Sequence, residues 1–306
     1  MWVFIILAIL ILTVLIIVGI SMVCVHIIVK AQKTPEEKLR KQEIEHGFAD
    51  ALKDYDNKWK RIPFVADTGE IKLSGEYIIN ETDHLTPKKV VVICHGHIVS
   101  RICSLKYAKV YYNKGFNIVL YDERYFGKSE GDYCTLGQKE SKDLQTITAL
   151  ARKTFGEDCI LALHGESMGA ATVLASLDYE SPDFVVADCP FASSIRLYEH
   201  VLKDNMHLPI KPILPIACMI AEKKYGYTIK EFNPIEAVRN SDVPICFMHG
   251  LDDKLIPCEH SEAMFKVCRN QKSEIHLFKG ADHAMSMSSD KERYEKELVG
   301  FIEKVL

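Results

Sequence analysis

The stretch that decides the fold is LALHGESMGAA, residues 161–171 of a 306-residue chain. It places a Gly-x-Ser-x-Gly pattern between an apolar run typical of a buried strand and a small-residue run that predicts a helix. A turn this tight excludes side chains at Gly165 and Gly169, and it lifts Ser167 above the sheet edge at the positive end of the helix. The alternative is a glycine-rich strand-to-helix turn with a structural serine.

A serine hydroxyl is a weak nucleophile, so it needs a histidine as base and an acid that orients the histidine. Both follow in the chain. Asp252 and Asp253 come directly after an apolar run at 243–249, and His283 follows another run at 274–278. The order Ser, Asp, His is the one that accompanies this kind of turn, with acid and base on successive loops at the carboxyl edge of the sheet. We therefore expect His283 as the base and one of the two aspartates as the acid.

Short apolar runs alternate with helical stretches from about residue 62 onward, which predicts a mostly parallel sheet with helices on both faces. The first two runs flank the turn 67–69 and predict an antiparallel pair. The expected strands are 64–65, 71–79, 89–94, 116–121, 159–164, 184–188, 243–249 and 274–278. The expected helices are 104–113, 139–155, 167–177, 260–268 and 291–305.

About fifty residues between the last-but-two and last-but-one strands carry no strand pattern, so we expect an inserted helical cap at about 191–241. The proline-interrupted apolar segment 208–221 is expected to roof Ser167 and to bind the substrate. Bulky substitution at Ile213 or Met219 should then change which substrates fit.

Residues 61–306 resemble the α/β-hydrolase superfamily, and within it the esterase/lipase and serine-aminopeptidase-like hydrolases. The resemblance rests on the Gly-x-Ser-x-Gly turn together with His95-Gly96, the D-x-R-x-x-G-x-S-x-G segment 122–131, the H-G-x-x-D-x-x-[VI]-P segment 249–257 and the Gly-x-x-His segment 280–283. We interpret Asp122, Arg124 and Ser129 of the second motif as a structural loop network. The resemblance implies the α/β-hydrolase fold and a Ser-His-Asp triad.

In that family the fifth position of H-G-x-x-D carries the acid, which implies Asp253. Asp252 beside it and Asp188, after an earlier strand, remain alternatives. The residue after the nucleophile, Met168, supplies one backbone amide to the oxyanion, and the resemblance places the second on His97. Its neighbour Ile98 stays open as a donor.

Metals and organic cofactors are not expected. His95-x-His97 could suggest a metal pair, but no third ligand accompanies it. His164 and His249, which precede glycines, are expected to pack or hydrogen-bond beneath the loops. The ten cysteines form no C-x-x-C pair and read as free thiols, which favours a reducing compartment.

Residues 2–29 hold no Asp, Glu, Lys or Arg, and as a helix they would reach about 42 Å, beyond the roughly 30 Å hydrocarbon core. We expect residues 1–29 to form a transmembrane helix rather than a cleaved signal, because the run is long and no A-x-A site follows it. Basic residues follow the run and none precedes it, so the bulk of the chain should face the cytoplasm in a single-pass arrangement. These residues are Lys30, Lys33, Lys38, Arg40 and Lys41.

Residues 30–60 read as a charged helical linker that stands the catalytic domain off the membrane. Thr34-Pro35-Glu36-Glu37 is typical of a helix start. A chain beginning near Thr34 should on this interpretation be soluble and active. The balance of 38 Lys+Arg against 42 Asp+Glu gives a net charge of −4, which argues against binding to nucleic acid through a basic surface.

The expected function is that of a membrane-anchored serine hydrolase that cleaves carboxylic esters through an acyl-enzyme. Its partners would be a small-molecule acyl substrate, which a lipid could supply, and the membrane. A peptidase or amidase with the same triad and a non-catalytic binding protein on this fold are the alternatives. The sequence leaves the oligomeric state open.

Overall fold

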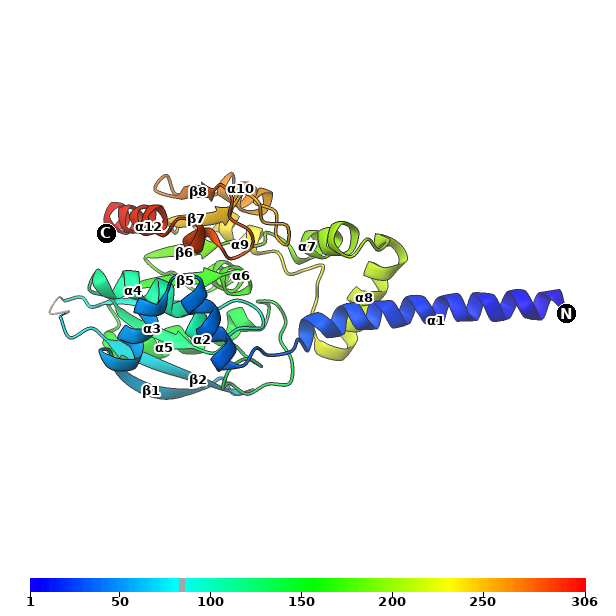
Figure 1. Ribbon diagram of the computed structural model, residues 1–306, viewed down its shortest axis with the longest axis horizontal. Helices are drawn as coiled ribbons and strands as arrows, with labels where there is room; N and C mark the ends of the chain where they lie inside the picture. The colour runs from blue at the N-terminus through cyan, green and yellow to red at the C-terminus, as the bar shows by residue number, and fades with distance from the viewer. Residues whose placement is uncertain (83–85) are drawn as a thin grey trace.

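A computed structural model describes residues 1–82 and 86–306, and its centre is an eight-stranded sheet of order β1-β2-β4-β3-β5-β6-β7-β8 (Figure 1). β1 and β2 pair antiparallel, β2 joins β4 antiparallel, and every other neighbouring pair is parallel. The predicted α/β-hydrolase fold class is confirmed. The strands are β1 Lys60–Asp67, β2 Lys72–Ile79, β3 Lys89–Cys94, β4 Asn117–Tyr121, β5 Ile160–Glu166, β6 Phe184–Asp188, β7 Ile245–Gly250 and β8 Glu274–Phe278.

Helices cover both faces of the sheet because its parallel strands are apolar on both sides. In β3, Val91 and Ile93 pack into one core with α3, α4 and α12, whereas Val90 and Val92 pack into a second core with α5, α6, α9 and α10. The helices of these layers are α3 Ala49–Asn57, α4 Leu105–Asn113, α5 Glu140–Phe155, α6 Met168–Ala175, α9 Pro234–Asn240, α10 Glu259–Phe265 and α12 Lys291–Val305. Short helical turns are η1 Arg101–Ser104, η2 Ser176–Asp178 and α11 Ser286–Ser289.

The N-terminal helix α1 (Trp2–Val29) projects from the body in Figure 1. Within the described residues, it is the one helix long and apolar enough to cross a bilayer, with a mean hydropathy of 3.5. Its first fifteen residues, 2–16, are exposed, whereas Ser21, Cys24, Val25 and Val29 are buried. The last third of the helix is therefore part of the folded body.

The segment predicted as a free linker packs against the body instead. α2 (Glu36–Glu45) and α3 follow α1, and Leu39, Phe48, Leu52 and Tyr55 are all buried there. The expectation of a spacer that stands the domain off is wrong, because these apolar side chains continue the core that covers one face of the sheet. The sequence suggested a linker because charged residues dominate this segment, and its four buried apolar residues were given less weight.

Helices alone fill the chain between β6 and β7. They are α7 Ser194–His200, the π-helical turn η3 Val201–Asn205, α8 Ile210–Tyr225 and α9. α8 lies along α1 (Figure 1), where Ser21 Oγ donates a hydrogen bond to the Ile213 carbonyl at 3.1 Å. A third apolar cluster joins the end of α1, α7, η3 and α8 over the carboxyl edge of the sheet.

Candidate active site

Ser167 stands on the turn between β5 and α6, and the backbone there is strained. Its φ is +55°, which is uncommon for a residue with a side chain. A Cβ at Gly165 would lie 2.2 Å from the Gly169 carbonyl oxygen, and one at Gly169 would lie 2.1 Å from the Cys94 carbonyl oxygen. Both glycines of the pattern are therefore required by close backbone approaches.

The structure brings the three predicted side chains together in a hydrogen-bonded relay. Ser167 Oγ donates to His283 Nε2 at 2.9 Å, and His283 Nδ1 donates to Asp253 Oδ2 at 2.7 Å. Asp253 lies on the loop after β7 and His283 on the loop after β8. This geometry allows the histidine to take the serine proton while the aspartate holds the ring.

Asp253 is held as a carboxylate. The backbone amides of Leu255 and Ile256 donate to its Oδ1 at 2.9 and 2.8 Å. Burial alone would favour the neutral acid, but hydrogen bonds from His249 and His283 outweigh burial and lower the pKa of Asp253 below its ordinary value. An ionised partner for His283 is what the relay needs.

The two alternative acids lie elsewhere. Asp252 is exposed to solvent. Asp188 is fully buried below the turn, where its carboxylate accepts hydrogen bonds from Tyr107 Oη at 2.9 Å and Ser286 Oγ at 3.1 Å. Its backbone carbonyl accepts from the Ser167 amide at 2.8 Å, so Asp188 supports the turn through its main chain.

His249 contributes more than the packing role expected for it. Its Nε2 lies 3.3 Å from Asp253 Oδ2 and 2.8 Å from the Ile256 carbonyl, and its Nδ1 lies 2.7 Å from Ser261 Oγ. The ring is fully buried. The H-G-x-x-D motif could have predicted the contact between His249 and Asp253, because its histidine lies four residues before the acid and the loop folds back on its own strand.

A mostly apolar cavity of about 140 Å³ opens beside the serine. Its walls come from α1, the turn after β3, α6, α7 and η3, and the loop after β7. The lining residues are Ile28, His97, Leu136, Ser167, Met168, Phe191, Leu197, Tyr198, Val201, Leu255 and Ile256. His97 and Met168, whose amides were predicted to bind the oxyanion, thus border the same space as Ser167.

The expectation that residues 208–221 roof the serine is wrong. The cap residues that line the cavity are Phe191 just before α7, Leu197 and Tyr198 of α7, and Val201 of η3. Ile213 of α8 is buried against the end of α1, and Met219 is 47% exposed on the outer side. α8 packs on α1 because both present apolar faces, which leaves the roof to the shorter helix before it.

The end of α1 and the residues just after it are hydrogen-bonded to the loops after β3 and β4. His97 Nε2 donates to the Ile28 carbonyl at 2.8 Å, and Tyr125 Oη donates to the Ala31 carbonyl at 3.0 Å. The Cys134 amide donates to the Val29 carbonyl at 2.9 Å. Carbonyls that a helix leaves without partners at its C-terminus are satisfied here by the enzyme body.

A buried charged cluster lies directly under the turn. Glu166 accepts from Lys106 Nζ and from Tyr107 Oη, both at 2.6 Å. Burial opposes ionisation of Glu166, but the ammonium of Lys106 lowers the pKa of this carboxyl. Glu43 of α2 faces the same lysine, and burial raises its pKa to about 7 against the pull of Lys106. The ammonium of Lys106 therefore faces two carboxyl groups. It stabilises the ionised form of Glu166, whereas burial favours the protonated form of Glu43.

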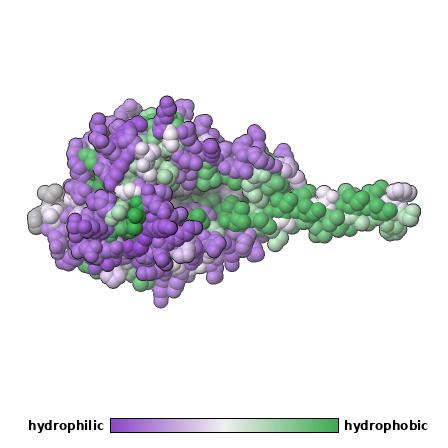
Figure 2. All heavy atoms as spheres, viewed as in Figure 1, coloured by the Kyte–Doolittle hydropathy of each residue, from purple (hydrophilic) through white to green (hydrophobic). Residues whose placement is uncertain are grey.

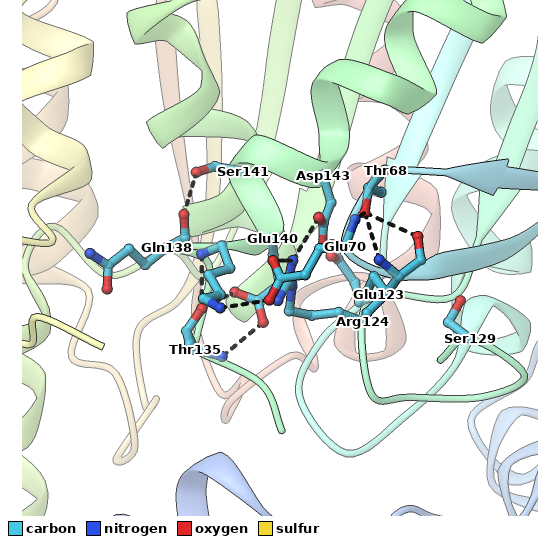
Figure 3. A network of polar contacts seen from close by, with 12 residues as sticks. Thr68, Glu70, Glu123, Arg124, Ser129, Thr135, Gln138, Glu140, Ser141 and Asp143 are labelled. Carbon is cyan, nitrogen blue, oxygen red and sulfur yellow. Dashed lines mark hydrogen bonds and ion pairs between the residues drawn. The ribbon is translucent and has the colours of Figure 1, made fainter. Parts of the chain in front are cut away.

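The D-x-R-x-x-G-x-S-x-G segment forms the loop network shown in Figure 3. Arg124 makes two hydrogen bonds of 2.7 Å to the Asp143 carboxylate. Ser129 Oγ accepts from the Ser74 amide at 2.9 Å. Glu140 accepts from the Thr135 amide at 2.8 Å. These contacts hold the loop after β4 to α5 and β2, away from the serine.

In the part of the chain that the structure describes, one further cavity and one cluster of possible metal ligands were considered as sites. A polar cavity of about 410 Å³ lies between α2, η1 and the loop after β4, and triad residues are not among its lining. Within the described residues, the one cluster that could hold a metal ion is Cys189, Asp253 and His283. Two of these three already take part in the relay. His95, which was considered as a metal ligand and not expected to be one, donates to the Gly96 carbonyl and accepts from the Glu123 amide.

A parallel sheet with a serine on the sharp turn after a central strand, and with acid and base on later loops, defines an α/β-hydrolase. The chain belongs to the prolyl oligopeptidase family, whose sequence model matches residues 110–306. The predicted superfamily is confirmed, and these matches support a serine hydrolase.

Relatives extend over most of the chain. The uncharacterized protein YqkD of Bacillus subtilis is 29% identical over 290 residues, which cover 94% of this chain and 93% of that one. The uncharacterized membrane protein YNL320W of Saccharomyces cerevisiae is 26% identical over 227 residues, 72% of either chain.

Solved structures share the fold at low identity. The Pyrococcus furiosus esterase Pf2001 superposes with a TM-score of 0.66 at 22% identity, covering 82% of this chain and 95% of the esterase. An acylaminoacyl peptidase from Pyrococcus horikoshii superposes with a TM-score of 0.64 at 18% identity, covering 84% of this chain but 43% of the peptidase. Esterases and peptidases are thus both neighbours of this fold.

Proposed function

We propose that the protein is a membrane-anchored serine hydrolase that cleaves carboxylic esters through an acyl-enzyme. The relay from Ser167 through His283 to Asp253, open to an apolar cavity, carries this proposal. Ser167 Oγ attacks the ester carbonyl while His283 takes the hydroxyl proton. The tetrahedral intermediate then collapses, His283 returns the proton to the departing alcohol, and water releases the acid by the same steps.

The backbone amides of His97 and Met168 are proposed to bind the negative oxygen of that intermediate. Each such donor contributes about 3 to 4 kcal/mol in a water-excluded site. Cys94 ends β3 and Met168 begins α6, so both loops meet at the sheet edge where Ser167 stands. Asp253 orients His283 and stabilises the imidazolium that forms.

Esters are favoured over peptides by the lining of the cavity. None of the eleven residues that line it is Asp, Glu, Lys or Arg. A peptidase that selects a charged terminus needs a partner for that charge, since burying an unpaired charge is costly. An acyl chain needs only apolar walls. Peptide or amide hydrolysis remains the second candidate, because the family and the P. horikoshii neighbour include peptidases.

The anchor is proposed to be α1, with the catalytic body on the cytoplasmic side. Length and hydropathy of α1 support insertion, and the five basic residues after it support that orientation. Ten free cysteines, with no disulfide among the described residues, agree with a reducing compartment.

The test is a substrate panel on the full chain in detergent. p-Nitrophenyl esters from acetyl to octanoyl should be hydrolysed, and aminoacyl p-nitroanilides should react at least a hundredfold more slowly. Ser167→Ala is the control and should abolish both reactions. Faster cleavage of the anilides would replace the ester proposal with the peptidase candidate.

A further inference from the structure

The last third of α1 presents one apolar face to the body. Ile17, Ile20, Cys24, Val25 and Ile28 recur at helical spacing and pack with the cap. Ser21 on the same face is fully buried and bonded to α8. A helix that served only as a membrane anchor would not need to bury one of its faces against the catalytic body.

Ile28 of this face lines the same cavity as Ser167. Its carbonyl also accepts the hydrogen bond from His97, the residue proposed to supply an oxyanion amide. The anchor helix therefore forms a wall of the substrate cavity and holds the loop beside the serine. Most other lining residues are buried, whereas Ile28, His97 and Val201 are half-buried and Leu255 is 41% exposed, so these four form the rim.

The length of α1 fixes the depth of this rim. A hydrocarbon core of about 30 Å takes about 20 residues of helix, which brings the chain from Trp2 to Ser21. Ile28 lies seven residues further, about 10 Å beyond, at the depth of the lipid headgroups. Figure 2 shows apolar surface continuing from the projecting helix onto the body beside it.

Resting on the proposed ester hydrolysis, we propose that the substrate is a long-chain acyl ester resident in the bilayer, and that its acyl chain reaches Ser167 laterally, past Ile28 and Val201. The bilayer then delivers the apolar chain to the rim without passage through water. When the acyl–oxygen bond breaks, the bridging ester oxygen takes a proton from His283 and leaves as part of the alcohol. Water then hydrolyses the acyl-enzyme, which releases the fatty acid and frees Ser167.

The experiment reconstitutes the full chain in phosphatidylcholine vesicles that contain 4-methylumbelliferyl oleate, and compares its hydrolysis with that of soluble 4-methylumbelliferyl acetate. The oleate rate should follow the mole fraction of oleate in the membrane when inert lipid is added at constant total oleate. Oleate in separate vesicles without the enzyme should react at least tenfold more slowly. Equal rates from both vesicle populations, or rates that ignore the mole fraction, would overturn lateral entry.

Variants at the wall make the test specific. Ile28→Trp should lower the ratio of oleate to acetate hydrolysis about tenfold, because the indole fills space worth roughly two methylenes. Val14→Trp, on the exposed part of the same helix, should leave the ratio unchanged. If Ile28→Trp does not fold, Ile28→Ala opens the same wall and should shift the preferred chain length upward. An unchanged preference in every folded variant at position 28 would overturn the role of α1 in the cavity.

The two proposals fail in different ways. Acetate hydrolysis without any dependence on position 28 or on membrane presentation removes this inference and leaves the ester hydrolase in place. Hydrolysis of neither ester, with an intact protein, removes the proposed function and the inference that depends on it.

Discussion

Ser167, His283 and Asp253 are the three side chains proposed to carry the chemistry, and their contacts predict how each replacement behaves. Ser167→Ala, His283→Ala and Asp253→Asn should each lower kcat/KM for p-nitrophenyl acetate by about 10³-fold or more, because the relay acts as a unit. The Ser167→Ala/His283→Ala double variant should be no worse than either single change. Steady-state kinetics on folded protein check these values.

Asp252→Asn is the matched control, since Asp252 is exposed one residue away from the buried acid. It should retain activity within about twofold of the wild type. A loss as large as that of Asp253→Asn would contradict the assignment of the acid.

The sequence predicted these three residues because a catalytic turn leaves local signals, namely two glycines and loop motifs after strands. It did not predict that Lys106 of α4 and Glu43 of α2 meet under Ser167 beside Glu166. Lys106 lies 60 residues before Glu166 and 63 residues after Glu43 in the chain, and charged helices usually face solvent, so no local pattern marks these contacts.

At the level of elements, the cavity wall depends on α7 and η3 rather than on α8. Val201→Trp should shift the preference from octanoyl toward acetyl esters by about tenfold, because the new ring occupies the space of the acyl chain. Met219→Trp changes an exposed position of α8 and should leave the preference as it is. Rates across the acyl series measure both, and the reverse pattern would restore α8 as the roof.

The strands and the helices beside the sheet were predictable because short apolar runs that alternate with helical patterns indicate a parallel sheet covered by helices. The packing of α1 on α8 was not, since an apolar residue that faces lipid and one that faces a protein helix look the same in a sequence. Small polar residues do not mark the difference either, because exposed Thr13 and buried Ser21 both occur in the run, and the partner of Ser21 on α8 is a backbone carbonyl that no sequence pattern reveals.

At the scale of the whole molecule, the burial of Glu43 in the N-terminal segment makes the free energy of unfolding depend on pH. Glu43 keeps its proton in the fold up to about pH 7, against about 4.5 when unfolded, so the fold binds the extra proton between these values and loses stability as pH rises through them. The difference between these two pKa values corresponds to about 3 kcal/mol at most. The thermal midpoint of Glu43→Gln, measured relative to that of the wild type, should therefore be higher at pH 8 than at pH 5.

Glu45→Gln, an exposed change on the same helix, should follow the wild type at both pH values. Asp143 and Asp188, whose pKa burial also raises to about 6, keep their own pH dependence, so the comparison between variants isolates Glu43. A constant difference between Glu43→Gln and the wild type from pH 5 to pH 8 would contradict the account of this buried acid.

Removal of α1 should also affect the whole molecule. A chain beginning at Thr34 exposes the α8 face around Ile213, Leu214 and Ala217 and loses the Ile28 wall, so the removable anchor expected from the sequence is not supported. This chain should associate on size-exclusion chromatography without detergent and should lose its preference for octanoyl over acetyl esters. A monodisperse chain with the full-length preference would contradict the structural role of α1.

If Ser167 is an activated nucleophile, a fluorophosphonate should label it covalently. The full chain is treated with this probe and the adduct is mapped by peptide mass spectrometry. We expect one adduct, on Ser167, that is absent in Ser167→Ala and strongly reduced in His283→Ala. An unlabelled Ser167 in folded protein, or equal labelling in His283→Ala, would contradict it.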